Sequence, residues 1–131
     1  MLEVIPGIYS TIHALLDDYV PPLSPRVDAN NNRYDMYYPH KVTLAGKDYP
    51  SLYFGGVAAY EKYAALYFFP IYTHPEEFTA VPTALKKLQK GKSCFHISKP
   101  DELLMKDVKL LLHKGFEFYI SKGLIGTHKK S

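Results

Sequence analysis

The run of residues from Tyr60 to Tyr72 constrains the fold more than any other part of the chain. From Tyr63 onward it has no charged residue and is dense in aromatic side chains. It is too short to cross a bilayer as a helix, which needs about 20 apolar residues, and its aromatics and Pro70 favour a strand. Alternate positions are apolar on both faces, with Ala64, Leu66 and Phe68 on one and Tyr63, Ala65, Phe69 and Ile71 on the other. Such a strand lies between two layers or has one face against a groove or a partner.

Size and charge narrow the class of protein. The length of 131 residues fits a single domain over residues 1–131. A formal net charge of +3, with the basic residues spread out, argues against a nucleic-acid partner. The single cysteine excludes an internal disulfide framework and suits a reducing cytoplasm, and the first residues lack the pattern of a signal peptide. We therefore expect a cytoplasmic protein with no membrane partner and no cofactor.

The pattern of apolar residues and turn residues predicts both helices and strands. A first helix opens near Pro6 and ends before Pro21 and Pro22, and residues 21–32 are predicted to be a loop. A helix over 83–89 is closed by Gly91, and the longest helix opens at 100–102. The predicted strands are 33–38, 42–44, 51–60, the aromatic run and 93–97.

Strands bracketed by helices at both ends favour an α+β fold. We expect an antiparallel sheet of about five strands, with the N- and C-terminal helices packed on one face. Gly55 and Gly56 inside a strand predict a bulge or a close backbone approach. Gly115 in the last helix predicts a kink or close packing.

Two segments, 66–72 (LYFFPIY) and 90–97 (KGKSCFHI), together with the order of the elements around them, resemble the YdhG-like, or frataxin-like, bacterial family of domains of unknown function. The resemblance is best from Tyr49 to Leu112. It implies an antiparallel sheet with helices packed on it and an intracellular protein. Because one branch of that family is described as an iron chaperone, the resemblance also implies an alternative role in metal delivery.

The acidic residues of the first helix bear on that alternative. Frataxins proper bind iron through a run of acidic residues there, whereas this chain has only Asp17 and Asp18, preceded by Glu3. Hard cations need several oxygen ligands that converge, and adjacent carboxylates on a helix do not face each other. We therefore expect weak iron binding or none.

Cys94 and His96 stand two apart in a predicted strand and so share a face. A thiolate and an imidazole in this position could ligate zinc or copper, or act as a nucleophile and a base. A zinc site would need two more ligands, for which His40 and His74 are the candidates. The other interpretation is a half-buried cysteine beside a surface histidine. No catalytic residue can be assigned, and residues 90–93 lack the strand–loop–helix context of a phosphate loop.

Tyrosine is abundant, with 12 residues, and most of the central ones fall on or beside the predicted sheet. If helices cover one face only, some tyrosines must line the other. The residues predicted to contact a ligand or a partner are Tyr53, Tyr60, Tyr63, Tyr67, Phe69 and Tyr72. The alternative is two-sided core packing. The expected function is a non-enzymatic binding protein that uses this face for a small molecule or for a weak homodimer, ahead of the iron chaperone and of an enzyme built on Cys94 and His96.

Overall fold

Antiparallel strands form one central sheet in the computed structural model, which describes residues 4–126. In spatial order its six strands are β1 (Ser24–Asp28), β2 (Arg33–Tyr38), β5 (Leu52–Ala59), β6 (Ala64–Phe68), β8 (Cys94–Ile97) and β7 (Gln89–Lys90). A separate hairpin of β3 (Val42–Leu44) and β4 (Lys47–Tyr49) connects β2 to β5. The α+β class is confirmed, and the sheet has six strands where about five were predicted.

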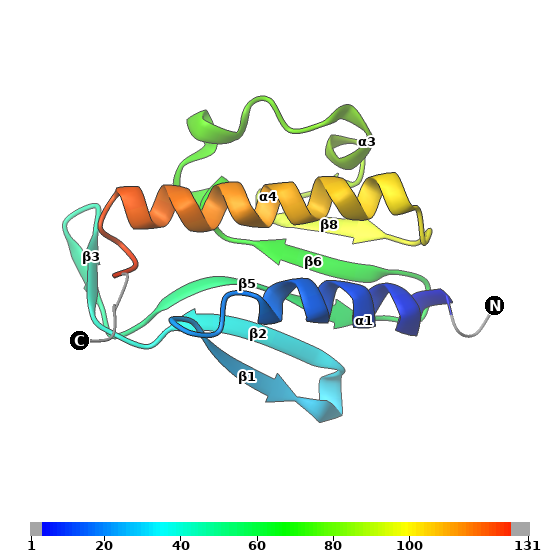
Figure 1. Ribbon diagram of the computed structural model, residues 1–131, viewed down its shortest axis with the longest axis horizontal. Helices are drawn as coiled ribbons and strands as arrows, with labels where there is room; N and C mark the ends of the chain where they lie inside the picture. Colours follow the sequence, from blue (N-terminus) through cyan, green and yellow to red (C-terminus); the bar gives the residue numbers. More distant parts are fainter. Residues whose placement is uncertain (1–3, 127–131) are drawn as a thin grey trace.

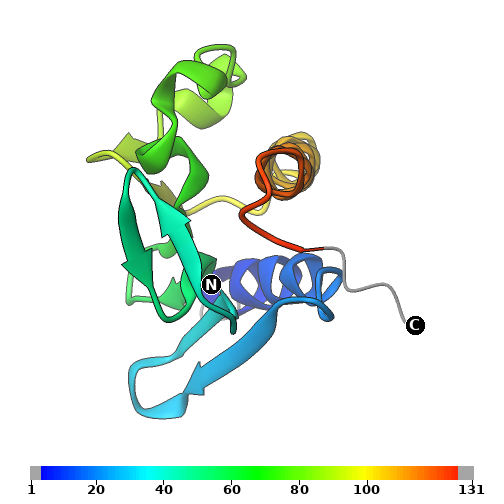
Figure 2. The same cartoon turned by 90° about the vertical axis from the view of Figure 1, so that its left-hand side faces the viewer.

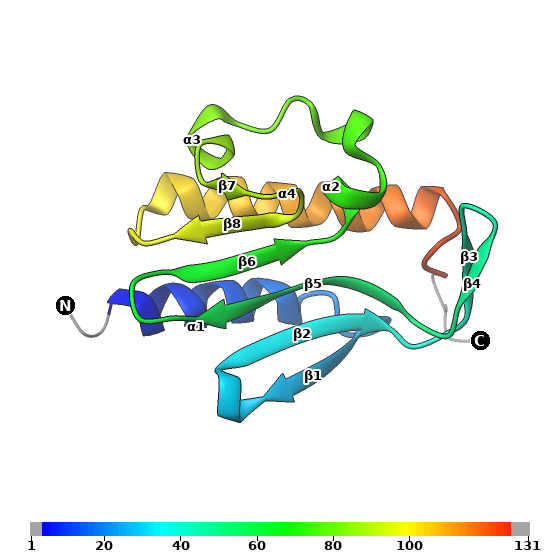
Figure 3. The ribbon, with the colours of Figure 1, turned by 180° about the vertical axis from the view of Figure 1, so that it is seen from behind.

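The two long helices, α1 (Val4–Asp17) and α4 (Glu102–Ser121), lie side by side on the same face of the sheet, as predicted (Figures 1 and 2). The short helices are η1 (Ala29–Asn31), α2 (Pro70–Thr73), η2 (Pro75–Phe78) and α3 (Thr83–Lys86). The segment from α2 to α3 lies beside the β8–β7 edge (Figure 2). Within residues 4–126, no helix lies over the opposite face of the sheet (Figure 3).

The core lies between the sheet and the two long helices. Leu66 and Phe68 of β6 are both 0% exposed, which confirms that the aromatic strand is central. A β carbon at Gly115 of α4 would collide with the Phe68 ring, so this glycine allows close packing and α4 continues through it. Asp101 caps α4, because its carboxylate accepts hydrogen bonds from the backbone N–H groups of the second and third residues that follow.

Three sequence predictions were wrong in detail. The loop predicted over 21–32 contains β1, an edge strand whose residues are mostly exposed and therefore give no alternating apolar signal. The helix predicted over 83–89 ends at Lys86, and Gly91 (φ +76°) forms the turn between β7 and β8 instead of a helix end. The aromatic strand ends at Phe68, because Pro70 begins α2.

The glycine pair of β5 behaves as predicted. The pairing of β2 with β5 shifts between Met36 and Tyr37, next to Gly55, and this shift is a bulge. Both glycines also meet neighbouring strands closely: a β carbon on Gly55 would overlap a backbone oxygen of β6, and one on Gly56 would overlap Asp35. Glu3 lies outside the described residues, as do residues 127–131.

Candidate binding surface

A row of directly paired residues crosses the sheet on the side away from the helices. Reading from β1 to β7, the paired residues are Arg26, Asp35, Gly56, Tyr67, Cys94 and Lys90. A neighbouring row on the same side consists of Asp28, Arg33, Ala58, Ala65 and His96. We call these rows, together with Tyr37 and Tyr53, the open face. Its centre has small residues, with larger polar and aromatic ones around them.

Asp35 and Arg33 form a hydrogen-bonded network in the middle of the open face. The Asp35 carboxylate accepts one hydrogen bond from Arg33 Nε at 2.7 Å and another from the Tyr53 hydroxyl at 2.7 Å. Asp35 is 7% exposed, so its charge needs both partners. The Arg33 guanidinium also lies 4.3 Å from the centre of the Tyr67 ring. Because Gly56 and Ala58 are small, Arg33 can extend across β5 to reach this ring.

The network changes the acidity of its members. Burial raises the pKa of Tyr53, and its hydrogen bond to Asp35 raises it further. Burial alone would lower the pKa of Arg33, but the hydrogen bond and the charge of Asp35 outweigh it, so the pKa rises. Burial also raises the pKa of Tyr67, to about 12. At neutral pH the Tyr53 and Tyr67 phenols are therefore protonated, and Arg33 is charged.

The six predicted aromatic residues form two contact groups on or beside the open face. Tyr53 packs on Phe69 with ring centres 5.8 Å apart, and Phe69 stacks on Tyr72 at 5.4 Å. At the other end, the Tyr60 hydroxyl lies 3.3 Å from that of Tyr67, and the Tyr60 ring lies 5.1 Å from Tyr63.

Cys94 and His96 share the open face, as their spacing predicts. The His96 ring stacks on Tyr63 at 3.9 Å. Burial raises the pKa of the Cys94 thiol, although the Tyr67 hydroxyl and Arg33 partly oppose this. His40 and His74 do not complete a metal site, because within residues 4–126 no three His, Cys, Asp or Glu side chains gather closely enough to hold a metal ion. His74 packs instead on Phe118 of α4, with ring centres 4.8 Å apart.

Sequence reasoning missed Arg33, Asp35 and Tyr37 as members of the candidate surface. Their alternation along β2 with the apolar side chains of Tyr34, Met36 and Tyr38 was the signal that could have found them. Arg26 was missed as well, because β1 was not predicted; its guanidinium lies 4.6 Å from the Tyr37 ring centre.

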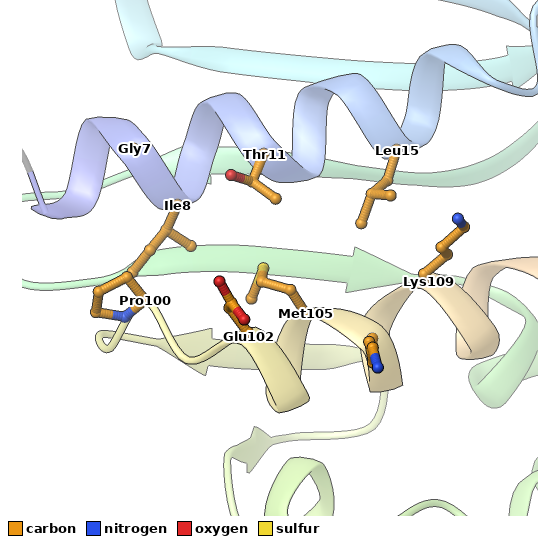
Figure 4. A pocket seen from close by; sticks show the side chains of 9 residues that line it. Gly7, Ile8, Thr11, Leu15, Pro100, Glu102, Met105 and Lys109 are labelled. Atoms are coloured by element: carbon orange, nitrogen blue, oxygen red, sulfur yellow. The ribbon is translucent and has the colours of Figure 1, made fainter.

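Clefts are found at other places on the molecule. A cleft of about 830 Å³ is lined by Tyr72 and His74 together with Lys86 and Lys92, and one of about 390 Å³ lies between α1 and α4 (Figure 4). Neither is lined by Tyr53 or Tyr67. The centre of the open face is thus a layer of mutually packed side chains, outside both clefts.

Comparison of the chain with protein-family models, with curated proteins and with solved structures finds no match. The resemblance to YdhG-like domains accordingly stays a prediction. No helix within residues 4–126 is long and apolar enough to cross a membrane.

Proposed function

We propose that the chain is a non-enzymatic cytoplasmic binding protein that associates weakly with a second copy of itself through the open face. The observation that carries this proposal is the layer of half-buried tyrosine and arginine side chains on a sheet face that no described helix covers. Tyrosine and arginine are enriched among the residues that dominate binding energy at protein interfaces. Small-molecule sites, in contrast, are concave.

The contacts within the open face support self-association. They are ring–ring contacts and contacts between guanidinium groups and rings, such as Arg26 on Tyr37 and Arg33 on Tyr67. A second copy offers the same groups, and a two-fold interface requires a patch that is complementary to itself. Because Asp35 already neutralises Arg33 within the chain, the association depends mainly on burial of aromatic surface, which favours a weak dimer.

The edges of the sheet are less suited to self-association than its face. Edge strand β1 contains Pro25, which has no backbone N–H to donate to an added strand. The other edge strand, β7, has two residues. Strand addition therefore has little backbone to pair with at either edge.

Sedimentation equilibrium from micromolar to millimolar concentration tests the proposal. The parent chain is expected to show a monomer–dimer equilibrium. The double variant Tyr60→Lys, Tyr72→Lys replaces two exposed rings (43% and 51% exposed) beside the open face by charged side chains. It should weaken the dimer at least tenfold.

The matched control is Leu103→Lys, Leu110→Lys, which changes two exposed apolar residues of α4 (71% and 65% exposed) by the same charge. It should leave the equilibrium unchanged. A strictly monomeric parent would overturn the proposal, and so would a dimer lost only in the α4 control. In the first case a small molecule becomes the occupant to test on the open face.

A further inference from the structure

The groove between α1 and α4 is an apolar surface that the open-face proposal does not use. Its volume is about 390 Å³ (Figure 4). Ile8 and Leu15 of α1 line it on one side and Met105 of α4 on the other. Gly7 lies at one end, and no other segment comes within 4 Å of the position that a β carbon would take there. The groove is therefore mainly apolar, with Thr11 between Ile8 and Leu15, and it is open at the Gly7 end (Figure 4).

Charged residues stand at the rim of this groove. Lys109 points toward the Leu15 end, whereas Glu102 lies near Ile8 at the other end (Figure 4). Lys106 also lines the groove, so cations outnumber carboxylates. None of the ion pairs found within residues 4–126 involves Lys106 or Lys109. An apolar channel with unpaired cations at its rim is complementary to a molecule that has a hydrocarbon chain and an anionic head.

The length of the groove indicates how long a hydrocarbon chain it can hold. Gly7 and Leu15 are eight residues apart on α1, and at about 1.5 Å per residue this is about 12 Å. With carbon–carbon bonds of about 1.5 Å in a zigzag, that length fits an extended chain of about ten carbons.

We propose that the groove between α1 and α4 binds a medium-chain fatty acid, with its carboxylate at Lys109 and its hydrocarbon chain running along α1 toward Gly7. Binding removes apolar surface of the ligand and of Leu15 and Met105 from water, which supplies most of the affinity. The lysine then selects an acid over a neutral or a cationic molecule of the same length.

Calorimetric titration of the full chain with straight-chain carboxylates, each below its micelle concentration, tests the proposal. From hexanoate to decanoate the affinity should rise about two- to fourfold for each methylene group, and dodecanoate should add little. Decanol should bind about fivefold more weakly than decanoate, and decylamine more weakly still. Absence of decanoate binding, an affinity independent of chain length, or equal binding of decanol would overturn the proposal.

Two variants locate the ligand. Lys109→Glu should reduce the decanoate affinity at least tenfold, whereas Lys87→Glu, which makes the same change in net charge at an exposed residue outside the groove, should not alter it. Gly7→Leu places a side chain at the open end without weakening α1, since leucine is the better helix former. It should move the chain-length plateau from about ten carbons to about eight. An unchanged plateau, or equal losses in the two lysine variants, would contradict this placement.

Discussion

The carboxylate of Asp35 lies in the space that a β carbon on Gly56 would need. The two residues are directly paired across β2 and β5, and the missing side chain lets Asp35 lie close to the sheet and accept hydrogen bonds from Arg33 and Tyr53. The glycine is thus part of the open face, because it makes room for the ion pair at its centre.

Gly56→Ala should therefore destabilise the fold by about 1–3 kcal/mol, the usual cost of forcing extra atoms into a packed site. Urea denaturation measures this change. Gly7→Ala is the matched control, and it should change the stability in the opposite direction. Its new β carbon meets nothing within 4 Å, and replacing a glycine inside a helix by alanine stabilises by roughly 0.5–1 kcal/mol. Equal effects at the two glycines would contradict the close contact at Gly56.

The central position of β6 leads to a second prediction. Leu66 is fully buried between the sheet and the helices, so Leu66→Ala should leave a cavity that costs about 2–5 kcal/mol. Leu103→Ala, at an exposed leucine of α4, should change the stability by less than about 0.5 kcal/mol. Thermal and urea denaturation compare both variants with the parent chain. A Leu66→Ala melting curve that coincides with the parent's would show that this strand is not central.

The sequence predicts those elements whose apolar pattern matches their environment. The strand predicted over 33–38 has the bounds of β2, because Tyr34, Met36 and Tyr38 are buried against the helices. Strand β1 could not be found in the same way. It lies at an edge, contains Pro25, and has Val27 65% exposed, so its strand conformation depends on pairing with β2 rather than on an apolar face.

The candidate surface could be predicted only in part. An excess of tyrosine, with helices at the two ends of the chain, indicates an aromatic sheet face. The partners of each ring depend on strand register, which the sequence does not contain. Arg33 reaches Tyr67 because β5 lies between them with small residues at the crossing. The groove between α1 and α4 likewise depends on how far apart the helices lie.

The buried and half-buried tyrosines predict a loss of stability at alkaline pH. Burial raises the pKa of Tyr19, Tyr34 and Tyr67 to about 12, whereas tyrosines of the unfolded chain titrate near about 10. The folded state holds these protons more tightly. Their contribution to stability is therefore fully present below pH about 10 and is lost as the pH rises through about 12.

Urea denaturation at a series of pH values should show this decline. Absorbance of the phenolate should show a separate class of tyrosines that ionise at a higher pH than the others. Burial also raises the pKa of Tyr53, so Tyr53→Phe should make the decline shallower whatever its effect at neutral pH. A decline of the same steepness in this variant would mean that other groups, such as lysines, cause it.

The raised pKa of Cys94 predicts that its thiol reacts slowly with thiol reagents. Burial is the main cause, and it leaves little thiolate at neutral pH. Labelling with a disulfide reagent should be slower in the folded chain than in a peptide of residues 90–97, and denaturation should remove the difference. Tyr67→Phe should slow the reaction further, because the Tyr67 hydroxyl stabilises the thiolate. Labelling faster than the peptide would favour the alternative of an enzyme built on Cys94 and His96.

Iron binding separates the remaining alternative from the open-face proposal. The Asp17 carboxylate accepts a hydrogen bond from the Tyr34 hydroxyl and lies 3.4 Å from His13 Nδ1, so it already has partners. Asp18 is the adjacent residue, and hard cations need several converging oxygen ligands. Anaerobic calorimetry with ferrous iron should therefore show no stoichiometric binding at micromolar concentration. If such binding is found, and Asp17→Ala, Asp18→Ala abolishes it whereas Glu76→Gln, Glu77→Gln at another adjacent acidic pair does not, the result favours the iron-chaperone alternative. Asp18→Asn alone, which keeps the Tyr34 contact, distinguishes loss of a ligand from loss of the fold.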